Sequence, residues 1–257
     1  MHVKGTLYFL LVSMFATGCA KHQVPITKRN QLMLLSKDDE IKMGRKNFRG
    51  IVNKSKICKD EEKKEMVNRV GQKLASTIKQ RKFNWEFILV ENDAINASCF
   101  PGGKVIINSG VFKVAKTDAQ LATILAHEMA HALSRHGSAR ISRERVLNTL
   151  EGAGALLAGI VNPLMIVPFL MAYETGTKQS IINPTIRIEE NEADLIGLHL
   201  MHKANYDLNE ALDFWHNLKT HNTNKKHKRN STHSSYDKRI KNIQKTIKKI
   251  KNKNKNI

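Results

Sequence analysis

Two histidines and a glutamate in the stretch AHEMAHALSRH, residues 126–136, have the types and the spacing of a metal-dependent hydrolase. Each residue of an α-helix advances by about 100°, so His127 and His131 lie on one face, one turn apart, where they can bind one zinc ion. Glu128 lies beside them, where a carboxylate can take a proton from the water that the metal activates. His136 would lie on the opposite side of an unbroken helix, so we expect a structural role for it.

The third metal ligand must come from outside this helix. A metzincin would carry Gly three residues and His six residues after His131, but the chain has Ser134 and Gly137 at these positions. A catalytic zinc site needs three protein ligands and one open position, and a carboxylate can replace a third histidine. We therefore expect an acidic third ligand further along the chain.

The acidic stretch IEENEAD, residues 188–194, supplies the candidates. Glu190 and Asp194 are four residues apart, which places them one turn apart on a helix. We expect Glu190 to bind the metal and Asp194 to accept the second ring N–H of a ligating histidine, that of His127. In the resulting mechanism the metal polarises the scissile carbonyl, while Glu128 takes a proton and passes it to the departing amine.

Helices and a small sheet must position these residues. Thr117 and Gln120 form a capping box at the start of the histidine helix, which meets no breaker before Gly137. Residues 85–90 and 104–112 are short β-branched and aromatic runs separated by turn formers, which predicts two strands. Apolar residues at three- and four-residue steps predict further helices. We therefore expect a mostly helical α+β fold with a small β-sheet beside the histidine helix.

The stretch from Gly152 to Tyr173 is apolar apart from Asn162, and it contains Pro163 and Pro168. Its length would permit a membrane span, but two internal prolines favour a broken helical hairpin. Three interpretations stay open: a true span, a buried core element, and a surface that contacts membrane or substrate.

The N-terminal residues predict export from the cytoplasm. A short apolar run, residues 6–16, follows Lys4, and the sequence ATGC at residues 16–19 resembles the bacterial lipobox, whose cysteine is lipidated. We expect a periplasmic protein with a lipid anchor at Cys19, and Ala20 favours the outer membrane by the same resemblance. An ordinary secretory signal is the alternative.

Positive charge is concentrated at the C-terminus. The chain has 43 Lys and Arg against 23 Asp and Glu, and residues 219–257 hold fourteen Lys or Arg with Asp237 as the single acid. Isoleucines at positions 240, 243, 247 and 250 predict a basic amphipathic helix. Contact with anionic lipid or lipopolysaccharide and a merely solvated tail both stay open, whereas export argues against nucleic acid.

These features predict four segments: a lipoprotein-type signal peptide at 1–18, a linker at 19–35, a zinc metallopeptidase domain at 36–240 and a basic tail at 241–257. In an exported protein, Cys58 and Cys99 would form a disulfide or remain two thiols.

The motif HEMAHALSRH, followed by ENEAD and preceded by INASCFPGGKVIINSGVF, resembles a family of gluzincin zinc peptidases. That family includes the CAAX prenyl endopeptidases, the HtpX and Oma-type proteases and the bacterial LoiP- and BepA-like envelope proteases, to which the resemblance is closest. It implies a zincin-like catalytic domain that binds one Zn²⁺ through His127, His131 and Glu190, with Glu128 as general base.

The resemblance also implies where a substrate lies. Asn96, Ala97, Gly102 and Gly103 match the family's substrate-binding region, and the strand after Gly103 would be a sheet edge that binds an extended peptide. Simple turn chemistry explains the Pro-Gly-Gly sequence equally well.

This sequence departs from the family's pattern near His233. Relatives often have a proline after the corresponding histidine, whereas this chain has Ser234. His233 would face the metal or the substrate, or lie in a solvated loop.

The resemblance implies an envelope endopeptidase that acts on unfolded or misassembled envelope proteins as quality control. The alternative function is a chaperone-like zinc-fold scaffold that binds unfolded outer-membrane proteins.

Overall fold

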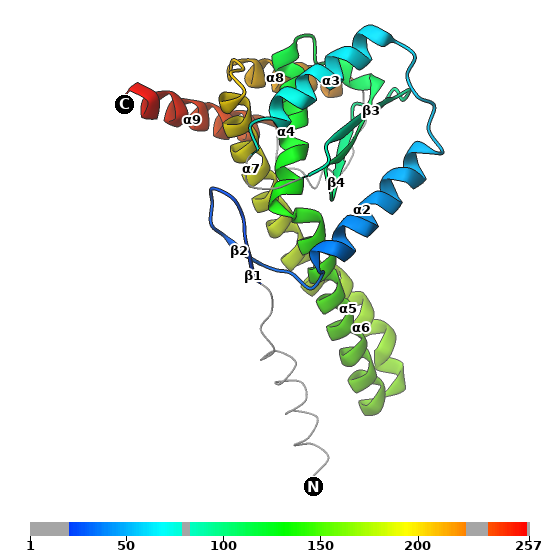
Figure 1. Ribbon diagram of the computed structural model, residues 1–257. Coiled ribbons are helices and arrows are strands. Elements are labelled where there is room, and N and C mark those ends of the chain that lie inside the picture. The colour runs from blue at the N-terminus through cyan, green and yellow to red at the C-terminus, as the bar shows by residue number, and fades with distance from the viewer. Residues whose placement is uncertain (1–20, 79–82, 225–235, 256–257) are drawn as a thin grey trace.

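The computed structural model describes residues 21–78, 83–224 and 236–255. It confirms the mostly helical α+β fold: helices surround a small sheet, and a helical hairpin projects from the body (Figure 1). In chain order the elements are β1 (Lys21–Gln23), β2 (Asn30–Leu32), α2 (Lys37–Val52), α3 (Glu61–Ala75), β3 (Glu86–Val90), β4 (Ala97–Phe100), β5 (Lys104–Asn108), the 3₁₀ helix η1 (Ser109–Lys113), α4 (Asp118–Ser134), α5 (His136–Val161), the 3₁₀ helix η2 (Pro163–Met165), α6 (Ile166–Ala172), the π-helix η3 (Tyr173–Lys178), α7 (Gln179–Lys203), α8 (Glu210–Asn224) and α9 (Tyr236–Lys255).

The small sheet has the strand order β3-β5-β4, with β5 parallel to β3 and antiparallel to β4. Both predicted strands are present, and β4 is an additional one. The expectation that the strand after Gly103 forms the edge is wrong, because that strand, β5, has neighbours on both sides. The edges are β3 and β4, and β4, whose short run of residues gives no clear strand pattern, is the edge beside the motif histidines.

Helix α4 runs through the core and carries the two motif histidines. Thr117 caps it by accepting a hydrogen bond from the backbone N–H of Gln120 at 3.1 Å. Helix α7 packs along α4, and Gly197 allows the close approach: a Cβ at this position would lie 3.1 Å from the backbone nitrogen of His127. The packing of α7 on α4 therefore places the acidic stretch beside the histidines.

Helix α4 ends earlier than the sequence predicts. Arg135, with φ +57°, adopts the left-handed conformation and separates α4 from α5. Its buried side chain donates to Glu40 at 2.6 Å and to the Leu35 carbonyl, which stabilises this conformation. The expectation that His136 lies on the far side of a continuous helix is wrong, because the chain turns at Arg135.

The described residues of the segments at 19–35 and 241–257 pack on the folded body. Strands β1 and β2 form a hairpin with buried Val24, and Gln31 donates to the Ser134 carbonyl at 2.5 Å, so this hairpin packs against the end of α4. Helix α9 is the predicted amphipathic helix, but its isoleucines are buried in the main core. Its apolar face is therefore packed within the protein. The lysines from Lys238 to Lys251 are exposed.

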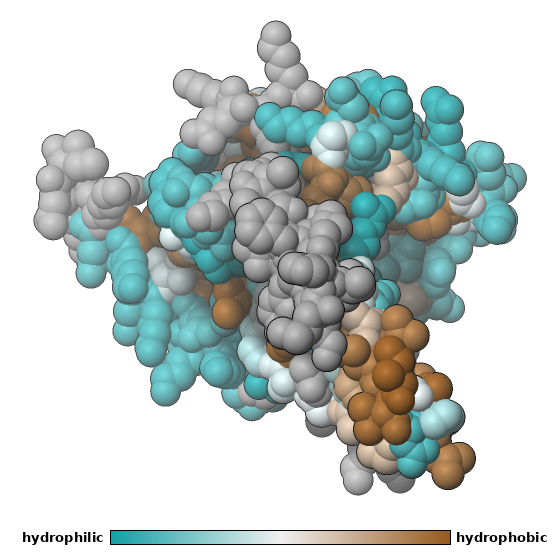
Figure 2. Space-filling model, turned by 90° about the horizontal axis from the view of Figure 1, so that it is seen from below, coloured by the Kyte–Doolittle hydropathy of each residue, from teal (hydrophilic) through white to brown (hydrophobic). Residues whose placement is uncertain are grey.

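Residues 152–173 lie mainly in the projecting hairpin formed by α5 and α6 (Figure 1). Pro163 lies in the turn and Pro168 in the first turn of α6, where a proline removes no helical hydrogen bond. Most large apolar side chains of the hairpin are exposed, which excludes a buried core element; Figure 2 shows them as a brown projection. Within the described residues, no helix is long and apolar enough to cross a membrane.

Candidate metal centre

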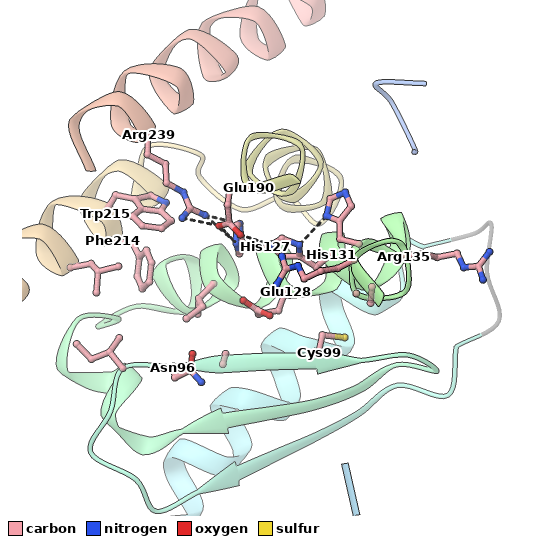
Figure 3. Close-up of a pocket in the computed structure, with 18 of the residues that line it drawn as sticks. Asn96, Cys99, His127, Glu128, His131, Arg135, Glu190, Phe214, Trp215 and Arg239 are labelled. Carbon is pink, nitrogen blue, oxygen red and sulfur yellow. Dashed lines mark hydrogen bonds and ion pairs between the residues drawn. The ribbon is translucent and has the colours of Figure 1, made fainter. Parts of the chain in front are cut away.

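Three side chains from two helices converge in the described structure. His127 and His131 come from α4 and Glu190 comes from α7 (Figure 3). The Nε2 atoms of the two histidines are 3.1 Å apart, and each lies 3.5 Å from an oxygen of Glu190. Tetrahedral zinc with ligands at about 2.1 Å places neighbouring ligand atoms about 3.4 Å apart. This cluster therefore fits a zinc ion.

Asp194 fixes the orientation of His127. Its Oδ1 lies 3.0 Å from Nδ1 of His127, so an Nδ1–H donating to this carboxylate leaves the Nε2 lone pair directed toward Glu190. Burial and Arg239 lower the pKa of His127, but its hydrogen bonds with Asp194 and Glu190 outweigh them and raise the pKa to about 9. The two carboxylates thus favour positive charge at this place, which a metal cation would supply.

His131 is oriented by a second histidine and a second carboxylate. Nδ1 of His136 lies 2.9 Å from Nδ1 of His131, and Nε2 of His136 lies 3.2 Å from Glu192. When Nε2–H of His136 donates to Glu192, its Nδ1 can accept from His131, which leaves Nε2 of His131 free for a metal. Burial raises the pKa of Glu192, but hydrogen bonds from His136, Arg29 and Thr27 outweigh it and lower the pKa to about 2.

We expect His136→Ala to lower zinc affinity about 10- to 100-fold, because partners that orient metal ligands typically contribute that much. Competition with a zinc-chelating dye measures the change. His216→Ala is the matched control, because this histidine is exposed on α8. Equal zinc affinity of the two variants would contradict the orienting role.

Arg239 of α9 also lies in the site, although the sequence predicts no role for it. Its guanidinium donates to both oxygens of Asp194 at 2.7 and 2.9 Å, lies 3.2 Å from Glu190, and stacks on Trp215 at 3.9 Å. One of its nitrogens is also 3.0 Å from the ring nitrogens of His127. Burial raises the pKa of Asp194, but Arg239 and His127 outweigh it and lower that pKa.

Glu128 lies on the other side of the two histidines and points toward β4 (Figure 3). Burial raises its pKa to about 7, against the opposing effects of His127 and of a hydrogen bond from the Cys99 backbone. Burial and the positive charge of His127 hold the pKa of His131 well below its usual value, which favours the neutral, metal-binding imidazole. Cys58 and Cys99 are free thiols.

A cavity of about 480 Å³ opens over this cluster and along β4. Asn96 and Ala97 line it, whereas Gly102 and Gly103 do not. These two glycines have φ values of +89° and +83° and form the turn from β4 to β5, so turn conformation explains them without substrate contact. His233 and Cys19 lie outside the described residues. The apolar end of the cavity is lined by Ile124, Phe214, Trp215, Leu218 and Tyr236.

Comparison with known proteins agrees with this geometry. Residues 61–247 match the model of peptidase family M48. The chain is 30% identical over 176 residues to the beta-barrel assembly-enhancing protease of Escherichia coli (strain K12), which covers 67% of this chain and 36% of that protein. It is 31% identical over 187 residues to the putative beta-barrel assembly-enhancing protease of Vibrio cholerae, covering 72% and 38%.

A mitochondrial relative shows the same relationship. The metalloendopeptidase OMA1 of Schizosaccharomyces pombe is 27% identical over 198 residues, which covers 76% of this chain and 56% of that protein. The chain thus spans less than two thirds of the length of these relatives. The family match covers most of the chain, including both histidines and the acidic stretch. We conclude that the chain belongs to peptidase family M48, and with it to the metalloproteases.

Proposed function

We propose that this protein is a zinc-dependent endopeptidase of the bacterial cell envelope that hydrolyses peptide bonds in unfolded or misassembled envelope proteins. One observation carries the peptidase assignment: Glu128 lies between a three-residue metal cluster and the open edge of a β-strand (Figure 3). A metal ligand set, a candidate base and a surface for a peptide backbone therefore share one cavity.

His127, His131 and Glu190 would hold the ion, while Asp194 and His136 keep the two imidazoles in the orientation that exposes Nε2. Zinc, when bound, polarises a carbonyl oxygen and acidifies water. Glu128 would take the proton of the attacking water and then donate it to the departing amine. Its burial beside His127 suits a carboxylate that changes protonation during the reaction.

Strand β4 can bind a substrate through hydrogen bonds between the two backbones. Asn96 accepts a hydrogen bond from Asn108 of β5 at 3.0 Å, and antiparallel pairing alternates direction along a strand. Ala97 and Cys99 therefore direct their N–H and C=O groups toward the open edge. The Cys99 N–H donates to Glu128 there, which leaves both Ala97 groups and the Cys99 C=O for a substrate. An extended peptide added there would be held through its backbone with little sequence selection, which favours unfolded substrates.

The envelope location rests on the lipobox-like ATGC at residues 16–19 and on the bacterial relatives named beta-barrel assembly-enhancing proteases. A lipid at Cys19 would place the protein at the inner leaflet of the outer membrane. The exposed lysines of α9 from Lys238 to Lys251 would add attraction to anionic lipid or lipopolysaccharide. Labelling of cells with an alkyne fatty acid tests the anchor, because the protein should take up the label and Cys19→Ser should not. Cell fractionation of the labelled protein then tests the location.

The test of the activity combines zinc determination with casein digestion. We expect about one zinc per chain, casein cleavage that stops when a chelator removes the metal, and recovery when zinc is returned. Zinc binding without cleavage, together with suppressed aggregation of an unfolded outer-membrane protein, would instead support the chaperone-like scaffold.

A further inference from the structure

The tip of the α5–α6 hairpin, residues 152–172, exposes many large apolar side chains. Soluble monomers rarely expose so many together, and a large exposed apolar surface usually marks a site of interaction. Val161 and Leu164 at the turn are 85% and 83% exposed. The same surface includes Leu156, Leu157, Ile160, Met165, Val167 and Met171. Figure 2 shows brown side chains gathered on this projection, with some pale and teal atoms among them. We propose that the hairpin tip inserts into one leaflet of a lipid bilayer.

The chemistry of the tip favours lipid over a protein partner. Residues 152–172 contain no Asp, Glu, Lys, Arg or His. Protein interfaces combine an apolar centre with arginine and a polar rim, and residues 152–172 contain neither arginine nor any other charged residue. Asn162, the polar residue at the turn, accepts a hydrogen bond from the backbone N–H of Leu164 at 3.0 Å and donates its own N–H to Ala158. Backbone polar groups at the turn are thus paired within the protein, as hydrocarbon requires.

The two legs of the hairpin pack closely through small residues. A Cβ on Gly154 would lie 2.3 Å from the ring of Phe169, and one on Gly159 would lie 3.0 Å from Ile166. Glycine at such contacts allows helices to approach without polar side chains, as in helix pairs within membranes. The legs therefore hold each other and leave the outer apolar surface for lipid.

Charged residues mark the boundary of the tip on both legs. Lys178 lies 3.7 Å from Glu151 and 2.8 Å from Glu174, just outside the uncharged segment. From Gly152 to Val161, ten helical residues extend about 15 Å. This is about half of a hydrocarbon core of roughly 30 Å. The length suits insertion into one leaflet.

The proposed lipid anchor would act on the same side. Leu34, just after β2, donates to Ser142 of α5 at 2.9 Å, so the β1–β2 hairpin lies beside the base of the α5–α6 hairpin. Cys19 precedes Lys21, the first residue of β1, by two positions. Acyl chains on Cys19 and the hairpin tip would hold the protein at two points and fix its orientation on the membrane.

The test measures the depth of residue 164 in vesicles of phosphatidylcholine, whose neutral surface gives no attraction to the lysines. Full-length chains with Leu164→Trp and, as matched control, Ile57→Trp are bound to vesicles with brominated acyl chains. Ile57 is also exposed but lies in the catalytic body beside β3. We expect bromine to quench the fluorescence of the tryptophan added at position 164. The fluorescence of the tryptophan added at position 57 should stay unchanged.

A second change makes the test specific. Leu157→Asp in the Leu164→Trp chain should reduce the inserted population about a hundredfold, because an aspartate in hydrocarbon is strongly unfavourable. Quenching should then disappear, while the melting temperature and hydrolysis of a soluble peptide stay unchanged. Equal quenching at positions 164 and 57 would overturn the proposal. A blue shift of the tryptophan fluorescence at 164 without quenching, together with dimerisation of the protein, would also overturn it, because a second copy rather than lipid would then cover the tip. The quenching and the melting temperature do not depend on zinc or proteolysis, so the proposal can fail independently of the proposed function.

Discussion

Replacement of Glu128 by Gln is expected to abolish peptide hydrolysis while the protein keeps its zinc and its fold. Gln has nearly the same shape as Glu but cannot accept a proton at neutral pH. Positioned acid–base groups contribute about 10²- to 10⁴-fold to rates, and Glu128 would serve in two proton transfers. Zinc should be retained, since the described ligand cluster consists of His127, His131 and Glu190 without Glu128.

The measurement compares the cleavage rate of fluorescent casein with the zinc content and the melting temperature of the same preparation. Glu62→Gln is the matched control, because Glu62 is an exposed glutamate in the first turn of α3. Undiminished cleavage by Glu128→Gln would refute its role as base. Loss of zinc together with activity would instead place Glu128 among the metal ligands.

The sequence predicts local features of the site better than its long-range contacts. The four-residue steps from His127 to His131 and from Glu190 to Asp194 follow from helix geometry, and the capping box at Thr117 sets the start of α4. The break at Arg135 does not follow from these rules. It depends on Glu40, which is 95 residues away in the chain, and on a left-handed conformation that is unfavourable for arginine.

The same limit explains the other corrections. Strand β4 is recognisable through its pairing with β5 rather than through its own residues. The isoleucines of α9 predict an amphipathic helix but do not tell whether lipid or protein covers them. Arg239, beside them, is 112 residues from His127 in sequence, so its place in the site depends on how α9 packs on α7.

Replacement of Arg239 by Met should destabilise the protein more than loss of an ordinary ion pair. Arg239 and Asp194 have side-chain exposures of 6% and 8%, so removing the guanidinium leaves a buried carboxylate without its main partner. Breaking a buried pair in this way costs about 3–5 kcal/mol. Urea unfolding measures the loss as a change in the free energy of unfolding.

The chain offers a control with the same bond geometry at the surface. Arg69 donates through the same two nitrogens to Asp118 at 2.9 and 2.7 Å, but the Arg69 side chain is 59% exposed. Arg69→Met should therefore lose far less stability than Arg239→Met, because exposed ion pairs contribute little. Equal losses would show that burial is not what makes the Arg239 pair important.

Zinc affinity then separates a positioning role of Arg239 from a purely structural one. Asp194 binds Arg239 and His127 at once, so loss of the guanidinium frees the carboxylate to move away from the imidazole. Arg239→Lys retains the charge but cannot hold both oxygens of Asp194 in the same planar geometry. We expect this variant to regain most of the stability and only part of the zinc affinity. Full recovery of both would mean that charge alone suffices and that Arg239 does not position His127.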